Sequence, residues 1–102
     1  MIFIERTYTV DDTAMPCRFF KPEPDRGDFL CRYEVDWPDT PWTGVGYGVD
    51  AVQALLLAMQ AAHIQMIVCR DETGTRLLLD GEENLAMPLA ETVRDLAPIS
   101  RV

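Results

Sequence analysis

The side chains that most often carry enzymatic chemistry are few and scattered in this sequence of 102 residues. The common classes of enzyme need a nucleophile with a base, a set of metal ligands, or a pair of carboxylates. His63 is the sole histidine, which excludes histidine clusters and the HExxH zinc motif. Cys69 follows it by six positions, on a different side of a helix. We therefore predict no catalytic residue, no metal site and no cofactor, and we interpret His63 as a partly exposed or hydrogen-bonded helix residue.

Two other patterns have the residue types of a binding site. Acidic side chains fall in segments with turn signals, where solvated carboxylates are typical. The stretch Trp42–Gly48 is rich in glycine and precedes a helix, as a phosphate-binding loop does. Asp50 would repel a phosphate there, and no P-loop lysine is present. We interpret the stretch as a glycine-containing strand that ends at the helix. The acidic residues in question are Asp11, Asp12, Asp25, Asp28, Glu82 and Glu83.

The three cysteines are an odd number without metal-ligand spacing, which favours reduced thiols in the cytosol over a disulfide framework. Cys17 and Cys31 fall in adjacent predicted strands, and a hairpin centred near Pro24 places them opposite each other. Two cysteines in this register could form a disulfide or bind a metal together with Cys69. We favour two small buried thiols.

The charge balance disfavours several classes of partner. Seventeen acidic residues against nine basic ones give a net charge of −8, and Lys21 is the only lysine. Nucleic-acid binding needs clustered Lys and Arg, so we predict none. An acidic surface favours solubility or a basic partner. The N-terminus, Met1 to Arg6, lacks the order of basic and apolar segments of a secretion signal, and we expect a cytoplasmic protein.

One long apolar helix is predicted over residues 48–70. Asp50 and Gln53 form a capping box at its start. The helix is apolar nearly all round, which requires cover on two sides, either by the C-terminal segment or by a second copy of the protein. Its glutamines and His63 leave fewer than the ~18 consecutive apolar residues of a membrane span, so we predict none. The stripe expected to face the core is Val52, Leu55, Leu56, Met59, Ala62, Met66 and Ile67, with Leu57, Ala58, Ala61, Ile64 and Val68 outside it.

Strand-like segments surround this helix. We predict strands over 2–10, 15–21, 29–37 and 42–48 before it, and 75–79 after it. Residues 22–27 are expected to stay outside the ladder because of their prolines and glycine. A short last helix would begin at Pro88, with an apolar repeat of Leu89, Val93 and Leu96. The hairpin register opposes Cys17 with Cys31, Phe19 with Phe29 and Met15 with Tyr33, all on one face.

Together these elements predict one small α+β domain over residues 1–102. An antiparallel sheet of four to five strands, in the order β-β-β-β-α-β, would pack on the long helix, with the short helix at the C-terminus.

The junction between the fourth strand and the helix reads Gly48-x-Asp50-x-x-Gln53-Ala54-Leu55. Together with the tail, this motif resembles a family of short uncharacterised bacterial proteins, known as a domain of unknown function. The resemblance implies a bacterial cytosolic domain and supplies no activity, substrate or catalytic residue. The tail segments are Leu78-Leu79-Asp80-Gly81-Glu82 and Met87-Pro88.

We predict a non-enzymatic protein-binding module, homodimeric and with an acidic surface. Its interaction surface would include the aromatic candidates Trp37, Trp42 and Tyr47, with His63 nearby. An immunity or antitoxin-like protein that neutralises a basic toxin is one concrete version. The alternative is a small-ligand-binding domain with a pocket between helix and sheet near Tyr47 and His63.

Overall fold

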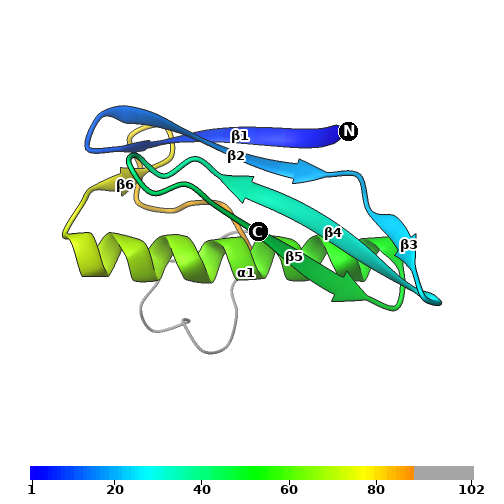
Figure 1. Ribbon diagram of the computed structural model, residues 1–102. Helices are drawn as coiled ribbons and strands as arrows, with labels where there is room; N and C mark the ends of the chain where they lie inside the picture. Colours follow the sequence, from blue (N-terminus) through cyan, green and yellow to red (C-terminus); the bar gives the residue numbers. More distant parts are fainter. Residues whose placement is uncertain (89–102) are drawn as a thin grey trace.

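The computed structural model describes residues 1–88 as a sheet of six antiparallel strands packed against one long helix (Figure 1). The predicted α+β class and the position of the helix are confirmed. The sheet has six strands instead of four to five, and the short helix predicted from Pro88 lies outside the described residues. The elements are β1 (Ile2–Val10), β2 (Thr13–Phe20), β3 (Glu23–Asp25), β4 (Asp28–Val35), β5 (Trp42–Gly48), α1 (Ala51–Thr73) and β6 (Leu77–Leu78).

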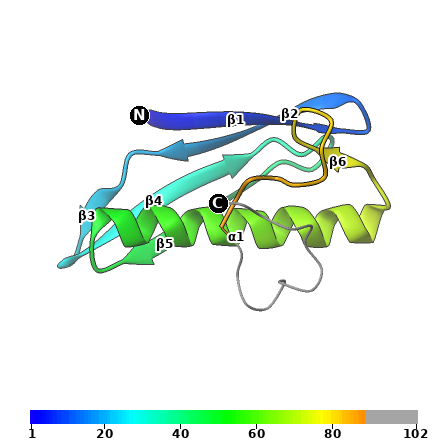
Figure 2. The same cartoon turned by 180° about the vertical axis from the view of Figure 1, so that it is seen from behind.

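Strands β1, β2, β4 and β5 form a meander, and β6 returns to the free side of β1 beside Thr9 and Val10. The short strand β3 pairs with the first part of β4, on the same side as β2. The helix runs along one face of this sheet, as both views show (Figures 1 and 2). Two-residue turns with positive φ connect the hairpins, at Asp11-Asp12 and at Arg26-Gly27.

The predicted hairpin centre at Pro24 is wrong. Positive φ angles of 50° at Arg26 and 89° at Gly27 suit a tight primed turn, and the chain reverses there. Pro24 instead pairs with Phe29 inside β3, so the exclusion of residues 22–27 from the ladder is also wrong.

Because the chain reverses later than predicted, every predicted cross-strand pair is wrong. Cys17 lies opposite Val35 and Phe19 opposite Tyr33, so the predicted pair of facing cysteines does not form. Met15 is buried, and its partner on β1 is Tyr8. The shift is four residues, an even number, so the same side chains still face the core.

The helix contacts β5 through small residues. Ala54, Ala58 and Ala62 recur every fourth position and are fully buried. A Cβ added to Gly46 would overlap the backbone nitrogen of Ala58 and lie 2.7 Å from the carbonyl oxygen of Ala54. A Cβ on Gly48 would overlap the start of the helix in the same way. The glycines of β5 therefore let the helix backbone lie directly on the strand.

This close contact corrects the predicted helix stripe. Val52 and Leu56 were expected to face the core, yet their exposed fractions are 67% and 44%. A glycine surface without side chains accepts the alanine row of the helix, and large side chains would hold the two backbones apart. The helix is therefore turned so that its alanines face the sheet.

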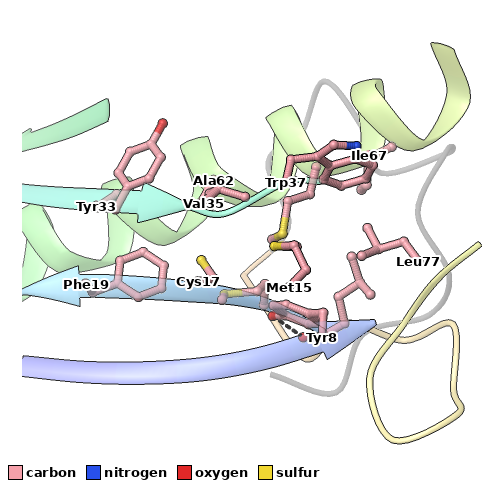
Figure 3. Packing of buried hydrophobic residues seen from close by; sticks show 14 of the residues in the cluster. Tyr8, Met15, Cys17, Phe19, Tyr33, Val35, Trp37, Ala62, Ile67 and Leu77 are labelled. Atoms are coloured by element: carbon pink, nitrogen blue, oxygen red, sulfur yellow. Dashed lines mark hydrogen bonds between the residues drawn. The ribbon is translucent and has the colours of Figure 1, made fainter. Parts of the chain in front are cut away.

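The rest of the core lies between the strands and the C-terminal half of α1 (Figure 3). Trp37 belongs to this cluster with only 4% of its surface exposed, so its prediction as an exposed aromatic is wrong. It follows β4 and continues the inward-facing series of Tyr33 and Val35. The other members drawn and labelled are Tyr8, Met15, Cys17, Phe19, Ala62, Ile67 and Leu77.

The caps of α1 confirm its predicted start, and they place its end later in the sequence than predicted. The Gln53 amide donates to Oδ1 of Asp50 at 2.8 Å, and the Gln53 side chain accepts from the Val49 amide at 2.7 Å. This is a capping box whose return bond reaches one residue earlier than usual. The helix continues three residues past Arg70 and ends at Gly74, whose left-handed φ of 67° suits a glycine C-cap.

We expect Gly46→Ala to lower the free energy of unfolding by about 1–3 kcal/mol, because its methyl group must displace the helix backbone. Urea denaturation measures the change. Thr43→Ala, an exposed position on the same strand, is the control and should change stability by less than about 0.5 kcal/mol. Equal midpoints for Gly46→Ala and the unchanged protein would contradict the close contact.

Candidate functional site

The solvent side of α1 carries no charged residue between Asp50 and Arg70. Its polar residues are glutamines, and several of its large apolar side chains are open to solvent. A helix on the surface of a soluble protein normally has charged residues on its outer face. By length and hydropathy α1 would also pass as a membrane span, a test that core helices of soluble proteins pass too. The described residues thus leave part of an apolar helix uncovered. The exposed apolar residues of the helix are Val52, Leu56, Leu57 and Val68.

One row of these side chains, which we call the outer stripe, consists of Leu57, Ala61, Ile64 and Val68. Leu57 and Val68 are 39% and 41% exposed, and the two residues between them are half-buried. The spacing of four, three and four residues is that of positions a and d in helices that pack against other helices. The outer stripe is therefore a surface of the kind that a second helix covers.

A hollow of about 290 Å³ lies at the C-terminal end of the outer stripe. Trp42 forms one wall, and its indole Nε1 donates to Oε1 of Gln65 at 2.7 Å. The same oxygen accepts from the Tyr33 hydroxyl at 2.6 Å, and the Trp42 ring stacks on Trp37 with centroids 5.7 Å apart. These contacts fix the wall in place. The lining residues are Trp42, Ile64, Gln65, Val68, Cys69 and Glu72.

Of the four residues predicted for an interaction site, only Trp37 and Trp42 come together. Tyr47 is 57% exposed and alternates along β5 with Gly46 and Gly48, which face the helix, so its ring points to the opposite face of the sheet. His63 is buried, with its Nδ1 2.9 Å from the carbonyl oxygen of Pro88. A pocket shared by Tyr47 and His63 is therefore wrong. Only Trp42 borders the outer stripe.

Two patterns in the sequence indicate this arrangement, and neither was used in the prediction. Gly44, Gly46 and Gly48 alternate, which marks the face of β5 that lies against the helix. Tyr47 then has to face away, and Trp42 shares the glycine face. The row of alanines at 54, 58 and 62 is the matching signal on the helix.

A second concave region lies between the helix and the sheet. Its volume is about 410 Å³, and its walls come from β1, β2, α1 and residues 86–88. Arg6 crosses the region to donate through Nη1 to the carbonyl oxygens of Leu85, at 3.2 Å, and Ala86, at 2.6 Å. The lining is mostly apolar, with two charged residues at β1. The residues are Ile4, Glu5, Arg6, Phe19, Met59, Ala86, Met87 and Pro88.

The buried titratable groups are poorly placed for chemistry. Burial raises the pKa of Cys17 to about 12 and also raises the pKa of Cys31, so both thiols stay protonated at neutral pH. Burial lowers the pKa of His63; the Pro88 carbonyl partly opposes this, and Arg70 adds to it. Within residues 1–88, no three His, Cys, Asp or Glu side chains gather where they could hold a metal ion.

The sheet face turned away from the helix carries a charged cluster. Arg18 binds Asp36 at 2.7 Å, Glu34 at 3.0 Å and Glu5 at 3.4 Å. One guanidinium group thus holds three carboxylates, one from β1 and two at the end of β4, and it neutralises part of the acidity of that face.

A protein family described as "Domain of unknown function (DUF6968)" matches residues 4–89. The match covers β1 to β6 and the helix, apart from the first residues of β1. Neither a curated protein nor a solved structure gives a significant match. The resemblance to an uncharacterised domain family is confirmed at this level.

We expect the stability of the protein to fall as the pH drops below the ordinary His63 pKa of 6.5. The lowered pKa means that the folded state binds the proton less tightly than the unfolded state, so acid favours unfolding. His63→Gln, which can still donate to the Pro88 carbonyl, should flatten the dependence of the unfolding free energy between about pH 7.5 and 5. Denaturation at a series of pH values measures both slopes, and identical slopes would contradict the assignment.

Proposed function

Given that this chain belongs to the family Domain of unknown function (DUF6968), we propose that it is a non-enzymatic, cytoplasmic protein-binding module whose docking surface is the outer stripe of α1. The observation that carries the proposal is the uncharged helix surface with Leu57 and Val68 open to solvent. The cores of protein interfaces are depleted of charged residues, and open apolar surface of this kind commonly marks a binding site.

The distribution of charge supports the same function. The net charge of −8 keeps the molecule soluble, although a long apolar helix lies at its surface. Within residues 51–69 of α1 the surface is neutral, so apolar contact and shape would govern recognition there. The acidic remainder disfavours nucleic acid as a partner.

The chemistry of the side chains supports a non-enzymatic role. His63 is buried and engaged with the Pro88 carbonyl, so it is not placed to exchange protons with a substrate. Cys17 and Cys31 are buried thiols with raised pKa values, whereas a cysteine nucleophile requires a thiolate.

We expect a double variant, Leu57→Glu with Val68→Glu, to lose the protein that the unchanged chain binds, because each buried carboxylate would lack a partner in the interface. Tagged protein would be used to capture its partner, including an untagged copy of itself, and the captured protein quantified by mass spectrometry. Binding should weaken at least about tenfold, or about 1.4 kcal/mol.

The matched control is Val52→Glu with Leu56→Glu, which adds the same charges to exposed apolar positions of the same helix. Val52 lies about 140° around the helix from Leu57, outside the outer stripe. Circular dichroism would establish that both double variants fold. Equal capture by the two variants, or no protein bound by the unchanged chain, would refute the proposal. Capture of a basic protein would favour the immunity or antitoxin-like version.

The cavity of about 410 Å³ supports a second candidate function, the binding of a small apolar molecule. Its volume lies within the usual range for ligand sites, and its lining combines apolar side chains with Arg6. The lining residues of this cavity do not include Tyr47 or His63.

Thermal-shift screening with small apolar compounds tests this second function. A compound at about 100 times its dissociation constant stabilises the folded state by about 2.7 kcal/mol. Met59→Trp, which fills the cavity, should abolish the shift, and the pair Leu57→Glu and Val68→Glu should retain it. A shift that survives Met59→Trp would place the compound elsewhere.

A further inference from the structure

The outer stripe is complementary to itself when a second copy runs in the opposite direction. We propose that two copies of this chain pair through their α1 helices, antiparallel, with a two-fold axis between Ala61 and Ile64. Leu57 of each copy then lies against Val68 of the other. This inference rests on the proposed protein-binding function and names its partner as a second copy.

The spacing of the outer stripe is compatible with antiparallel pairing of two copies. Its intervals of four, three and four residues read the same from either end, so a reversed copy presents a residue opposite each member. Leu57 opposes Val68 of the second copy, and Ala61 opposes Ile64. The row is about 16 Å long at 1.5 Å per residue, which is three turns of helix. Small Ala61 beside branched Ile64 lets the two rows interdigitate at the centre.

The hollow beside Val68 can receive Leu57 of a second copy in the antiparallel arrangement. It lies at the C-terminal end of the outer stripe, and Leu57 protrudes at the N-terminal end. An antiparallel pair places the leucine of each copy over the hollow of the other, so both ends of the interface are filled at once. Gln65, Val68, Cys69 and Glu72 line the hollow with the spacing of a helical hole that receives a knob. Trp42 closes its side.

Charge favours a second copy over a basic protein as the occupant. No carboxylate lies among residues 51–69 of α1, so a basic surface would form no ion pair with the outer stripe itself. Gln60 and Gln65 flank the row on its two sides, and both are uncharged. The acidic residues elsewhere repel between copies at long range, and salt screens this repulsion. Self-association should therefore strengthen as ionic strength rises.

Light scattering coupled to size-exclusion chromatography tests the pairing on the full chain at tens of micromolar. The unchanged protein should have twice the monomer mass of 11.6 kDa. Leu57→Lys alone and Val68→Glu alone should each weaken self-association at least about tenfold. A variant with both changes should dimerise again, because the antiparallel register brings the introduced ammonium of one copy beside the introduced carboxylate of the other. Val52→Lys is the control and should remain dimeric.

Each other outcome overturns the pairing in a defined way. A monomeric unchanged protein overturns it, whether the outer stripe is bare or covered by residues 89–102. If that monomer still captures a different protein through the outer stripe, the proposed function stands. A dimer that survives both single variants uses another surface, and a double variant that stays monomeric rules out the antiparallel register.

Cross-linking supplies a second measurement in case a charged variant fails to fold. In a Cys69→Ser background, Ala61→Cys should join two copies through a short bismaleimide, because the two positions lie about 4.5 Å apart along the paired axes. Leu57→Cys should not join to itself, since the same offset is about 16 Å. Cross-linking at both positions would indicate parallel helices, and failure of Ala61→Cys to cross-link would exclude the proposed axis; either result would overturn the proposal.

Discussion

The contact between the glycines of β5 and the alanines of α1 determines how the rest of the molecule is arranged. Gly46 and Gly48 leave no room for a side chain between strand and helix, so the two backbones touch. The helix must then present its smallest residues to the sheet, and Ala54 and Ala58 are the ones in place. All larger side chains of the first three turns are directed sideways or outward. The exposed apolar surface is a direct result of this close packing.

The second half of the helix obeys a different constraint. There the glycines end, and bulky Met66 and Ile67 fill the space beneath Trp37 and Leu77. The buried side of α1 therefore changes along its length, from alanines on β5 to large residues in the core cluster that Trp37 and Leu77 share. One helix thus contributes to two kinds of packing, and its outer surface keeps a continuous row of apolar residues from Leu57 to Val68.

Much of this fold was predictable from local signals, and the candidate site was less so. The cap at Asp50 and Gln53, the approximate positions of the five predicted strands and the inward-facing residues of β2 and β4 depend on neighbouring positions in the sequence, and they were correct; the short strand β3 was missed. The strand register was wrong because two turn signals, Pro24 and Arg26-Gly27, competed within six residues. The helix stripe was wrong at Val52 and Leu56. Hydrophobicity ranks Leu56 above Ala58 as a core-facing residue, whereas the close approach of the helix backbone to Gly46 leaves room only for the alanine. This lack of room results from the packing of the helix on β5, which a pattern of neighbouring residues in the sequence does not report.

The stacked pair of Trp37 and Trp42 gives the molecule a built-in optical signal. These are its only two tryptophans, and they touch each other. One ring belongs to the core and the other borders the hollow beside Val68, so the tryptophan fluorescence of the whole protein originates at a single point. Unfolding of the core and binding of a molecule at the hollow would therefore both change the same tryptophan emission.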